Sequence, residues 1–486
     1  MGVSPTDRTV RFFLLIFWSL AANAESPAHV EAWLNATDMA TEEVEASLLM
    51  ADYFRVDTTN PPGNERLGAQ FLAEQLTIDG IASTLTAFSP GRDSLIAKLE
   101  ANSKSGTSKE GALCLLSHID VVETESSSWT HPPLSGIIKD GFIWGRGAID
   151  MKGTGALQLH VFRMLHRMNV PLKRDVVLLA VADEESLNRG IQHVIDNHWD
   201  DIQCSQAFNE GGIGIEDLIF EGQDVFSISI GEKGVLWLRM TAQGVAGHGS
   251  TPRPEQSPDI LVEAIKRLQA YNEPFSPPAT FSTLMSLVGR QKGGLQGWIL
   301  QHPTFVRTLL KGKVLKNHLT RASTTNTINL SGLEGSVVPN VVPSQSSALL
   351  DVRVLPGRST AEMLEKITAT VNDPRVSFEI ITAREAEVSP GDDPAYWALA
   401  NQIQAIRPDA VVGPIISPGF TDSVFLRKKG VHAYGLAPYM MPATELLGMH
   451  GDNERISLEN VNLGLRILWG AVLELVADPS SRPPND

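Results

Sequence analysis

The sequence predicts an α/β protein with a mainly parallel sheet, into which a smaller α+β domain is inserted. Expected strands and helices alternate between residues 94 and 185, which is typical of a parallel sheet covered by helices on both faces. After Ser229 the pattern changes to strands around a glycine-rich turn, and strand–helix alternation resumes from about Thr382. With 486 residues, 42% of them hydrophobic, the chain is too long for one ordinary domain.

The first 24 residues match a secretory signal peptide. Arg8 and Arg11 precede an apolar run at residues 12–20, and Ala22-Asn23-Ala24 supplies a small-residue cleavage site after Ala24. This run is too short to span a bilayer comfortably, and no later segment approaches the required length. We therefore expect a secreted or periplasmic mature chain without a stable membrane span; an uncleaved N-terminal membrane anchor is the alternative.

The first part of the chain, residues 25–230, is expected to form the first half of a catalytic domain. Hydrophobic periodicity predicts helices at 41–55 and 65–78, separated by a break that contains Pro61-Pro62-Gly63. The following elements are expected to be strands at 94–99 and 113–117, a helix at 154–168 and a buried strand at 175–182. Functional residues in such sheets gather at the carboxyl ends of strands, where His118, Glu184 and Glu185 fall.

Residues 231–381 are expected to form the inserted domain, and residues 382–486 the second half of the catalytic domain. A strand at 235–243, a helix at 259–271, strands at 327–330 and 347–354, a helix at 360–371 and a strand at 376–381 make a small α+β unit. Residues 272–322, rich in Pro, Gly, Lys and aromatic residues, form a long additional insertion.

Composition narrows the choice of partners. The formal net charge is −16, which argues against nucleic acid or an anionic membrane surface as a partner. The two cysteines, Cys114 and Cys204, do not make a disulfide framework. Cys114 lies in an apolar strand, so we expect it to behave as a small buried hydrophobic residue.

His118 and Asp120 lie two residues apart at the end of an apolar strand, so their side chains share one face. A metal-binding histidine commonly donates its second ring N–H to a carboxylate. Alone, the pair indicates only a polar strand end, but acidic motifs follow. A two-metal site needs a bridging carboxylate, further His and carboxylate ligands, and a separate carboxylate that takes a proton from water. The candidates are His118, Asp150, Glu184, Glu185, Glu210 and His450.

Five motifs in fixed order carry a resemblance to a known family. S-H-I-D-V-V, G-R-G-A-I-D-M-K-G, D-E-E, N-E-G-G and M-H-G-D-N-E-R together resemble the metallopeptidase 20 family, which includes aminoacylase, succinyl-diaminopimelate desuccinylase and glutamate carboxypeptidase. The signal segment, the long insertion before T-T-N-T and the H-G-x-x-E-R-I ending look most similar to its carboxypeptidase S and N-fatty-acyl-amino acid hydrolase branch.

The resemblance implies a di-zinc site, with Co or Mn as substitutes, in the parallel-sheet domain. Asp150 would bridge two Zn²⁺ ions, of which one is held by His118 and Glu210 and the other by Glu185 and His450. Glu184 would be the general base and later the proton donor, and Asp120 would orient His118. The resemblance also implies a cis peptide bond between Asp150 and Met151. Many relatives read D-E-G where this chain has Asn209-Glu210-Gly211, so a neighbouring charge is lost.

In the inserted domain the resemblance implies a lid or dimerisation role. Gly247-His248-Gly249-Ser250 is similar to a family turn whose histidine stabilises the oxyanion, and in dimeric relatives that histidine comes from the partner subunit; a homodimer is left open. Asn340 and Arg353 match positions that hold the substrate's carbonyl and carboxylate. Gly419 and Thr421 match a loop that meets its C-terminal carboxylate. The plainer alternatives are a histidine in a flexible turn and an arginine at an ordinary strand end.

The resulting expectation is a zinc-dependent metallopeptidase or amidohydrolase. It would cleave the amide bond of small peptides or N-acyl amino acids that end in a free carboxylate, as a carboxypeptidase does. An N-acyl-amino acid hydrolase or aminoacylase is the alternative within this class. A binding protein that keeps the fold without catalysis is the remote alternative.

Overall fold

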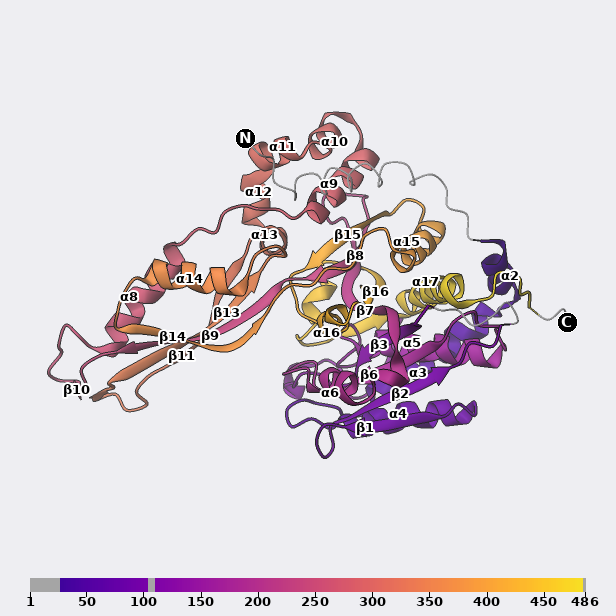
Figure 1. Cartoon of the computed structure of the whole chain (residues 1–486), viewed down its shortest axis with the longest axis horizontal. Helices are drawn as coiled ribbons and strands as arrows, with labels where there is room; N and C mark the ends of the chain where they lie inside the picture. Colours follow the sequence, from indigo (N-terminus) through magenta and orange to yellow (C-terminus); the bar gives the residue numbers. More distant parts are fainter. Residues whose placement is uncertain (1–26, 104–109, 484–486) are drawn as a thin grey trace. The chain divides into compact units, whose positions relative to one another are not determined.

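The computed structural model describes residues 27–103 and 110–483, which divide into two compact units (Figure 1). The first unit takes in the described chain up to Ile228, Ser389–Gly413 and the described residues from Phe425 onward. The second comprises Ser229–Val388 and Pro414–Val424. The inserted domain was predicted at residues 231–381, whereas the second unit also includes residues 382–388 and Pro414–Val424. The predicted signal peptide, residues 1–24, lies outside the described residues.

An eight-stranded sheet has the order β1-β2-β6-β3-β7-β16-β8-β15. Strands β6, β3, β7 and β16 are parallel neighbours, and β1 and β2 are antiparallel additions at one edge. This arrangement confirms the predicted α/β class with a mostly parallel sheet. The strand bounds are β1 Ser83–Ala87, β2 Asp93–Leu99, β3 Ala112–His118, β6 Val176–Val181, β7 Cys204–Glu216, β8 Val225–Glu232, β15 Val411–Ser417 and β16 His432–Pro442.

Helices cover this sheet. Helices α3, α5 and α17 pack on one another, α5 contacts β3 and β6, and α17 contacts β16. Residues of α6 pack with the alternate side chains of β3 and β6 in a separate buried cluster. The bounds are α2 Ala28–Ala36, α3 Met39–Phe54, α4 Glu65–Ile78, α5 Lys152–Arg167, α6 Arg189–Asn197, α7 Trp199–Ile202, α15 Pro394–Ile406, α16 Ser423–Lys428 and α17 Leu458–Val476. No helix within 27–103 or 110–483 is long and apolar enough to cross a bilayer.

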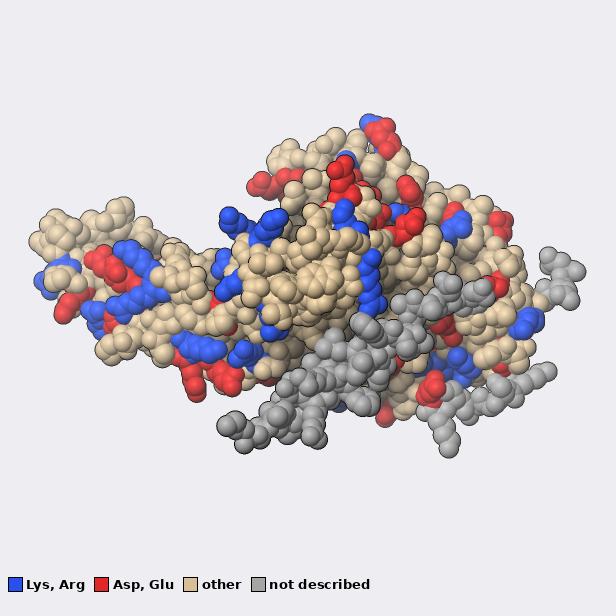
Figure 2. Space-filling view, turned by 90° about the horizontal axis from the view of Figure 1, so that it is seen from above, with Lys and Arg blue, Asp and Glu red and all other residues tan. Residues whose placement is uncertain are grey.

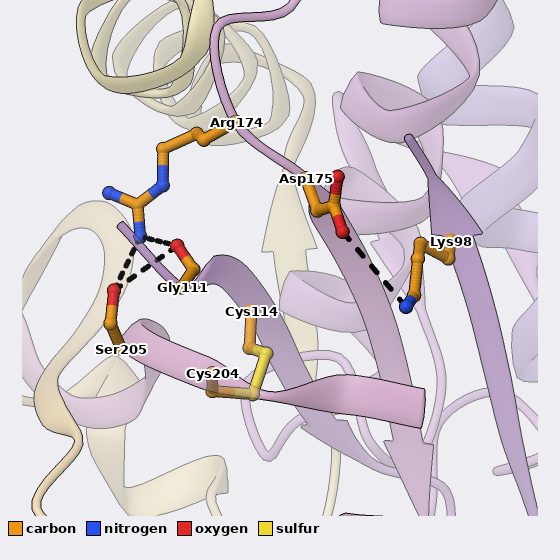
Figure 3. Close-up of a disulfide and its surroundings, with 7 residues drawn as sticks. All are labelled: Lys98, Gly111, Cys114, Arg174, Asp175, Cys204 and Ser205. Carbon is orange, nitrogen blue, oxygen red and sulfur yellow. Dashed lines mark hydrogen bonds and ion pairs between the residues drawn. A yellow bond between two sulfur atoms is a disulfide. The ribbon is translucent and has the colours of Figure 1, made fainter. Parts of the chain in front are cut away.

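The structure adds a covalent link that the sequence did not predict. Cys114 in β3 and Cys204 in β7 form a disulfide, with their Cα atoms 5.7 Å apart (Figure 3). The expectation that Cys114 is an ordinary buried apolar residue is therefore wrong in one respect, because its sulfur is bonded. The register pairs Ala112 with Cys204, so the two cysteines lie diagonally across neighbouring strands. The two cysteines are 90 residues apart in the sequence, so their positions along the chain did not indicate that they lie close together.

The second unit contains a four-stranded antiparallel sheet in the order β11-β13-β9-β14. Its strands are β9 Gly234–Gln243, β11 Thr327–Glu334, β13 Gln345–Val354 and β14 Val376–Arg384. Helices α8 (Ser257–Ala270) and α14 (Thr360–Val371) contribute their apolar faces to one buried cluster with this sheet. Every strand and helix predicted for the inserted domain is present, with bounds that differ by a few residues.

The long insertion between α8 and β11 is helical. Its helices are α9 Ala279–Lys292, α10 Gly294–Leu300, α11 Pro303–Phe305, a π-helical turn Val306–Leu310, α12 Lys311–Lys316 and α13 His318–Thr324. Lys233, at the start of the sheet, fixes the end of this insertion. Its buried Nζ donates to the main-chain oxygens of Ala322 and Thr325 at 3.0 and 2.8 Å and to Thr327 Oγ1 at 3.2 Å.

Lys233 should make stability depend on pH. Burial, with a smaller contribution from Arg353, lowers the pKa of Lys233 from 10.5 to about 7. Between these two pH values the unfolded chain binds a proton that the folded chain lacks, so stability is gained as pH rises from 7 towards 10.5. The thermal unfolding midpoint should therefore rise more steeply with pH in the wild type than in Lys233→Met. Lys366→Met, on the partly exposed surface of α14, is the control and should leave the slope unchanged; equal slopes for wild type and Lys233→Met would contradict the prediction.

Candidate metal centre

Two neighbouring parallel strands bring the first two predicted ligands together. His118 ends β3, and Glu210 lies within the adjacent strand β7. His118 Nε2 is 2.9 Å from Asp150 Oδ1 and 3.7 Å from Glu210 Oε1. The other ring nitrogen, Nδ1, lies 2.8 Å from the main-chain oxygen of Asp120. A neutral imidazole that donates Nδ1–H to this oxygen leaves Nε2 as the ligand atom, so the strand end fixes the tautomer.

Asp150 is presented by a loop that a buried glutamate holds in place. The peptide bond between Asp150 and Met151 is cis, as predicted. Glu454 accepts hydrogen bonds from the main-chain N–H groups of Gly147, Ile149 and Asp150 at 2.9, 2.7 and 3.2 Å. The same carboxylate accepts from Arg146 Nη1 at 2.7 Å. Glu454 belongs to the M-H-G-D-N-E-R motif, but the sequence did not indicate this role.

The glutamate pair after β6 is positioned by Asp120. The two carboxylate oxygens of Asp120 accept hydrogen bonds from the main-chain N–H groups of Glu184 and Glu185, each at 3.1 Å. Asn60 Nδ2 donates to the same carboxylate at 2.8 Å. The Asp120 carboxylate was expected to orient His118, but its Oδ1 lies 3.8 Å from His118 Nδ1, beyond hydrogen-bond distance. Its side chain thus supports the Glu184–Glu185 turn, and its main-chain oxygen supports His118.

His450 completes the cluster from the far end of the sequence. Its Nε2 lies 3.1 Å from Asp150 Oδ2 and 3.2 Å from Glu185 Oε1. The backbone of His450 has a φ of 56°, a left-handed conformation that is uncommon for residues other than glycine. Such conformations concentrate at functional sites, where the surrounding structure holds them. Thus the structure brings all six predicted residues of the cluster together, including Glu184, which lies near His118 and Glu210.

The electrostatics of the cluster favour cations. Burial raises the pKa of Glu185 and, together with the charge of Asp150, holds the pKa of Glu210 well above its usual range. The hydrogen bonds that the protonated His450 ring donates to Asp150 and Glu185 raise the pKa of His450 to about 10. Burial also raises the pKa of Asp150, but its hydrogen bonds to His118 and His450 outweigh burial and lower it overall. Four carboxylates therefore face two imidazoles, an excess of buried acid that bound cations would neutralise.

The donor set fits two zinc ions. Zinc in proteins binds imidazole nitrogen and carboxylate oxygen, and a two-metal site needs one carboxylate that contacts both ions. Asp150 directs Oδ1 towards His118 and Oδ2 towards His450, the arrangement that a bridging carboxylate requires. His118, Asp150 and Glu185 offer ligand atoms within 4.8 Å of one another, and so do His118, Glu184 and Glu210.

The remaining predicted residues lie in the second unit. His248 is exposed in a short β-ladder in which β10 (Gly247–His248) pairs with β12 (Val341–Val342), and Asn340 is exposed next to it. Arg353 forms a two-pronged ion pair with Asp351 at 2.6 and 3.0 Å. Thr421 donates its N–H and its hydroxyl to Glu232, both at 3.0 Å, and the N–H of Gly419 donates to Ser417 Oγ at 3.2 Å.

Glu454→Gln should both destabilise the chain and weaken metal binding. Glu454 and Arg146 form a fully buried ion pair, and removing one partner of such a pair typically costs about 3–5 kcal/mol. Loosening of the Gly147–Asp150 loop should also lower metal content per chain. Denaturant unfolding and elemental analysis measure the two effects. The control is Glu445→Gln, which breaks a more exposed pair with Arg455 and should cost at most about 1 kcal/mol. Equal effects of the two variants would contradict the assigned role.

Comparisons with known proteins agree with this geometry. The family model described as peptidase family M20/M25/M40 matches residues 114–474. The N-fatty-acyl-amino acid synthase/hydrolase PM20D1 of Homo sapiens is 28% identical over 379 residues, which are 76% of this chain and 74% of the human protein. The probable carboxypeptidase S-like 2 of Dictyostelium discoideum is 28% identical over 361 residues, 72% of this chain and 68% of that protein.

A solved structure extends the likeness to the fold. The M20 family metallo-carboxypeptidase Sso-CP2 from Sulfolobus solfataricus superimposes with a TM-score of 0.67 at 20% identity, covering 89% of this chain and 99% of that one. The family expected from the five sequence motifs is thus confirmed, and so is its carboxypeptidase S and N-fatty-acyl-amino acid hydrolase branch. Matched over most of its length, the chain belongs to peptidase family M20/M25/M40, a family of metal-dependent hydrolases.

Proposed function

We propose that the protein is a di-zinc hydrolase that cleaves the amide bond of small peptides or N-acyl amino acids ending in a free carboxylate. The observation that carries the proposal is Asp150, whose two carboxylate oxygens face His118 and His450 respectively. His118 and Glu210 would hold one ion, Glu185 and His450 the other. When bound, the zinc ions would supply Lewis-acid polarisation of the carbonyl and lower the pKa of a water molecule.

Glu184 is the residue proposed to move the proton. It is adjacent to the ligand Glu185, and its carboxylate lies near His118 and Glu210. Asn188 Nδ2, at 3.5 Å from Glu184 Oε1, lies on the same turn. A carboxylate placed here accepts a proton from the attacking water and returns it to the leaving amine nitrogen. The main-chain hydrogen bonds to Asp120 keep Glu184 and Glu185 in fixed, different directions, so that one can bind metal while the other moves protons.

His248 is proposed to donate a hydrogen bond to the oxyanion. The main-chain N–H of Ser250 donates to His248 Nδ1 at 3.2 Å, and Ser250 Oγ lies 2.8 Å from the same nitrogen. Because Nδ1 accepts, a neutral ring carries its proton on Nε2, which is the donor that an oxyanion requires. The exposed Asn340 and Gly419 in the same unit are proposed substrate contacts, together with Thr421 and Arg353. Arg353 would have to exchange Asp351 for the substrate carboxylate.

Secretion is part of the proposal. The N-terminal sequence pattern of residues 1–24 supports export. Disulfides form and persist in oxidising compartments, so the Cys114–Cys204 bond supports the same location independently.

An N-acyl-amino acid hydrolase is the second candidate function, favoured by the similarity to the human N-fatty-acyl-amino acid synthase/hydrolase PM20D1. Release of free amino acid from N-acetyl, N-fatty-acyl and dipeptide substrates that share one C-terminal residue would decide between the two. Turnover of dipeptides above N-acyl substrates supports the carboxypeptidase, and the reverse order supports the N-acyl hydrolase. The matching amides, which lack the free carboxylate, should be cleaved poorly. Metal-replete protein that turns over no member of the panel would favour a binding protein.

A further inference from the structure

The charge of this chain is unevenly distributed. No Asp or Glu occurs between Glu273 and Glu334, although the whole chain carries a formal net charge of −16. The same segment contains seven basic residues: Arg290, Lys292, Arg307, Lys311, Lys313, Lys316 and Arg321. It corresponds to the inserted helices α9–α13 and to β11. A net charge taken over the whole chain therefore conceals a strongly basic helical segment, and the argument from composition against an anionic surface does not apply to it.

Large apolar side chains are exposed on the same helices. Leu295, Trp298, Phe305 and Leu309 are 74%, 46%, 38% and 62% exposed. Leu295 and Trp298 lie in α10, Phe305 in α11 and Leu309 in the π-helical turn, and the exposed His302, with an extended backbone, joins α10 to α11. The rings confirm that the positions adjoin, because the centroid of Trp298 is 4.2 Å from that of His302 and 5.0 Å from that of Phe305. We call these five residues the apolar stripe.

We propose that the inserted helices dock on an anionic lipid surface. A helical segment that combines an exposed apolar face containing Trp and Phe with Lys and Arg, and that lacks acidic residues, has the composition of an interfacial membrane-binding element. The leucines and aromatic rings would enter the boundary of the acyl chains, and the basic residues would contact the negative headgroups. Figure 2 shows the molecule from above; the central part of this face is largely tan, with blue side chains at its sides and red ones beyond its upper edge.

Charge also distinguishes an anionic lipid surface from the other partners that could bind the apolar stripe. In a symmetric dimer built through this face, the basic segment of one copy would oppose that of the other, and like charges repel. A nucleic acid would satisfy the charges but would offer little apolar contact to Leu295 and Leu309. An anionic bilayer satisfies both features. The inference does not depend on the proposed substrate or on turnover.

Co-sedimentation of the purified chain with lipid vesicles tests the proposal. The chain should bind phosphatidylcholine vesicles that contain phosphatidylserine, bind pure phosphatidylcholine vesicles weakly, and dissociate as salt is raised. The double substitution of Leu295→Ser with Leu309→Ser should weaken binding about tenfold or more. Lys313→Gln should weaken it about fivefold, the value expected for one basic residue near a charged membrane.

Matched controls separate the stripe from general surface effects. Ile78→Ser with Leu48→Ser removes two leucine-sized side chains that are 70% and 54% exposed on α4 and α3. Lys139→Gln removes one exposed lysine from β4 (Ile137–Lys139). Neither control should change vesicle binding, and all variants should keep the wild-type unfolding midpoint. Equal binding to neutral and anionic vesicles, no binding, or equal losses in stripe and control variants would overturn the proposal. So would a homodimer that dissociates only in the Leu295/Leu309 variant, because a second copy would then occupy the stripe.

Discussion

Glu184→Gln is expected to lower kcat by about 10²–10⁴-fold while the chain keeps its full metal content. The amide has nearly the shape of the carboxylate but does not accept a proton from water, so the chemical step should fail. The ligands of the metal centre remain in place, because Glu184 and Glu185 are held separately by their main-chain hydrogen bonds to Asp120. Steady-state kinetics and elemental analysis on the same preparation measure both quantities.

The matched control for this variant is Glu221→Gln, an exposed glutamate in the same unit that should leave kcat unchanged. A variant that loses metal together with activity would show that Glu184 is a ligand or a structural residue. A variant that retains wild-type kcat would show that another group carries the proton.

Mixing two inactive variants is expected to restore about a quarter of wild-type activity if the site is shared between subunits. Both His248→Ala and Glu184→Gln should be inactive alone, the first through loss of an oxyanion donor, a change that typically costs about 10²–10³-fold. In a mixed dimer, one site combines an intact Glu184 with an intact His248 of the other copy. Half of randomly formed dimers are mixed, and each has one functional site.

The control mixes Glu184→Gln with the double variant Glu184→Gln/His248→Ala, a pair from which no intact site can form. Activity should stay at background in that mixture. If no activity returns in the test mixture although mixed dimers are demonstrated by native mass spectrometry, His248 acts within its own chain or takes no part in the reaction.

Much of this architecture could be predicted because it is encoded locally. Helix α4 was expected at residues 65–78, where the structure has it, since Pro61-Pro62-Gly63 and Gly80 mark both of its ends. The residues that cluster around Asp150 lie in short motifs with characteristic neighbouring residues. These motifs therefore identified the candidate metal ligands from the sequence. Strand β3 could be placed because its residues form an apolar run that ends in polar ones.

What escaped prediction depends on contacts between distant residues. Glu454 stabilises the Asp150 loop by accepting hydrogen bonds from three of its main-chain N–H groups, and it pairs with Arg146, a residue 308 positions earlier. Nothing in the neighbourhood of Glu454 indicates that partner. Asp120 showed the correct spacing to His118, yet its carboxylate contacts N–H groups more than 60 residues away. The helices of residues 279–324 could not be predicted, because glycine and proline interrupt the hydrophobic pattern of this segment.

The disulfide also changes how the chain would respond to a protease. By joining Cys114 to Cys204 it closes a covalent ring that contains His118, Asp150, Glu184 and Glu185. Cleavage of one peptide bond within the ring, for instance in the segment 122–133 after β3, opens the ring but releases no fragment. The nicked molecule would keep its mass apart from one added water, and two pieces would separate only after reduction. Cleavage outside the ring would divide the molecule at once, so gels run with and without reductant distinguish the two events.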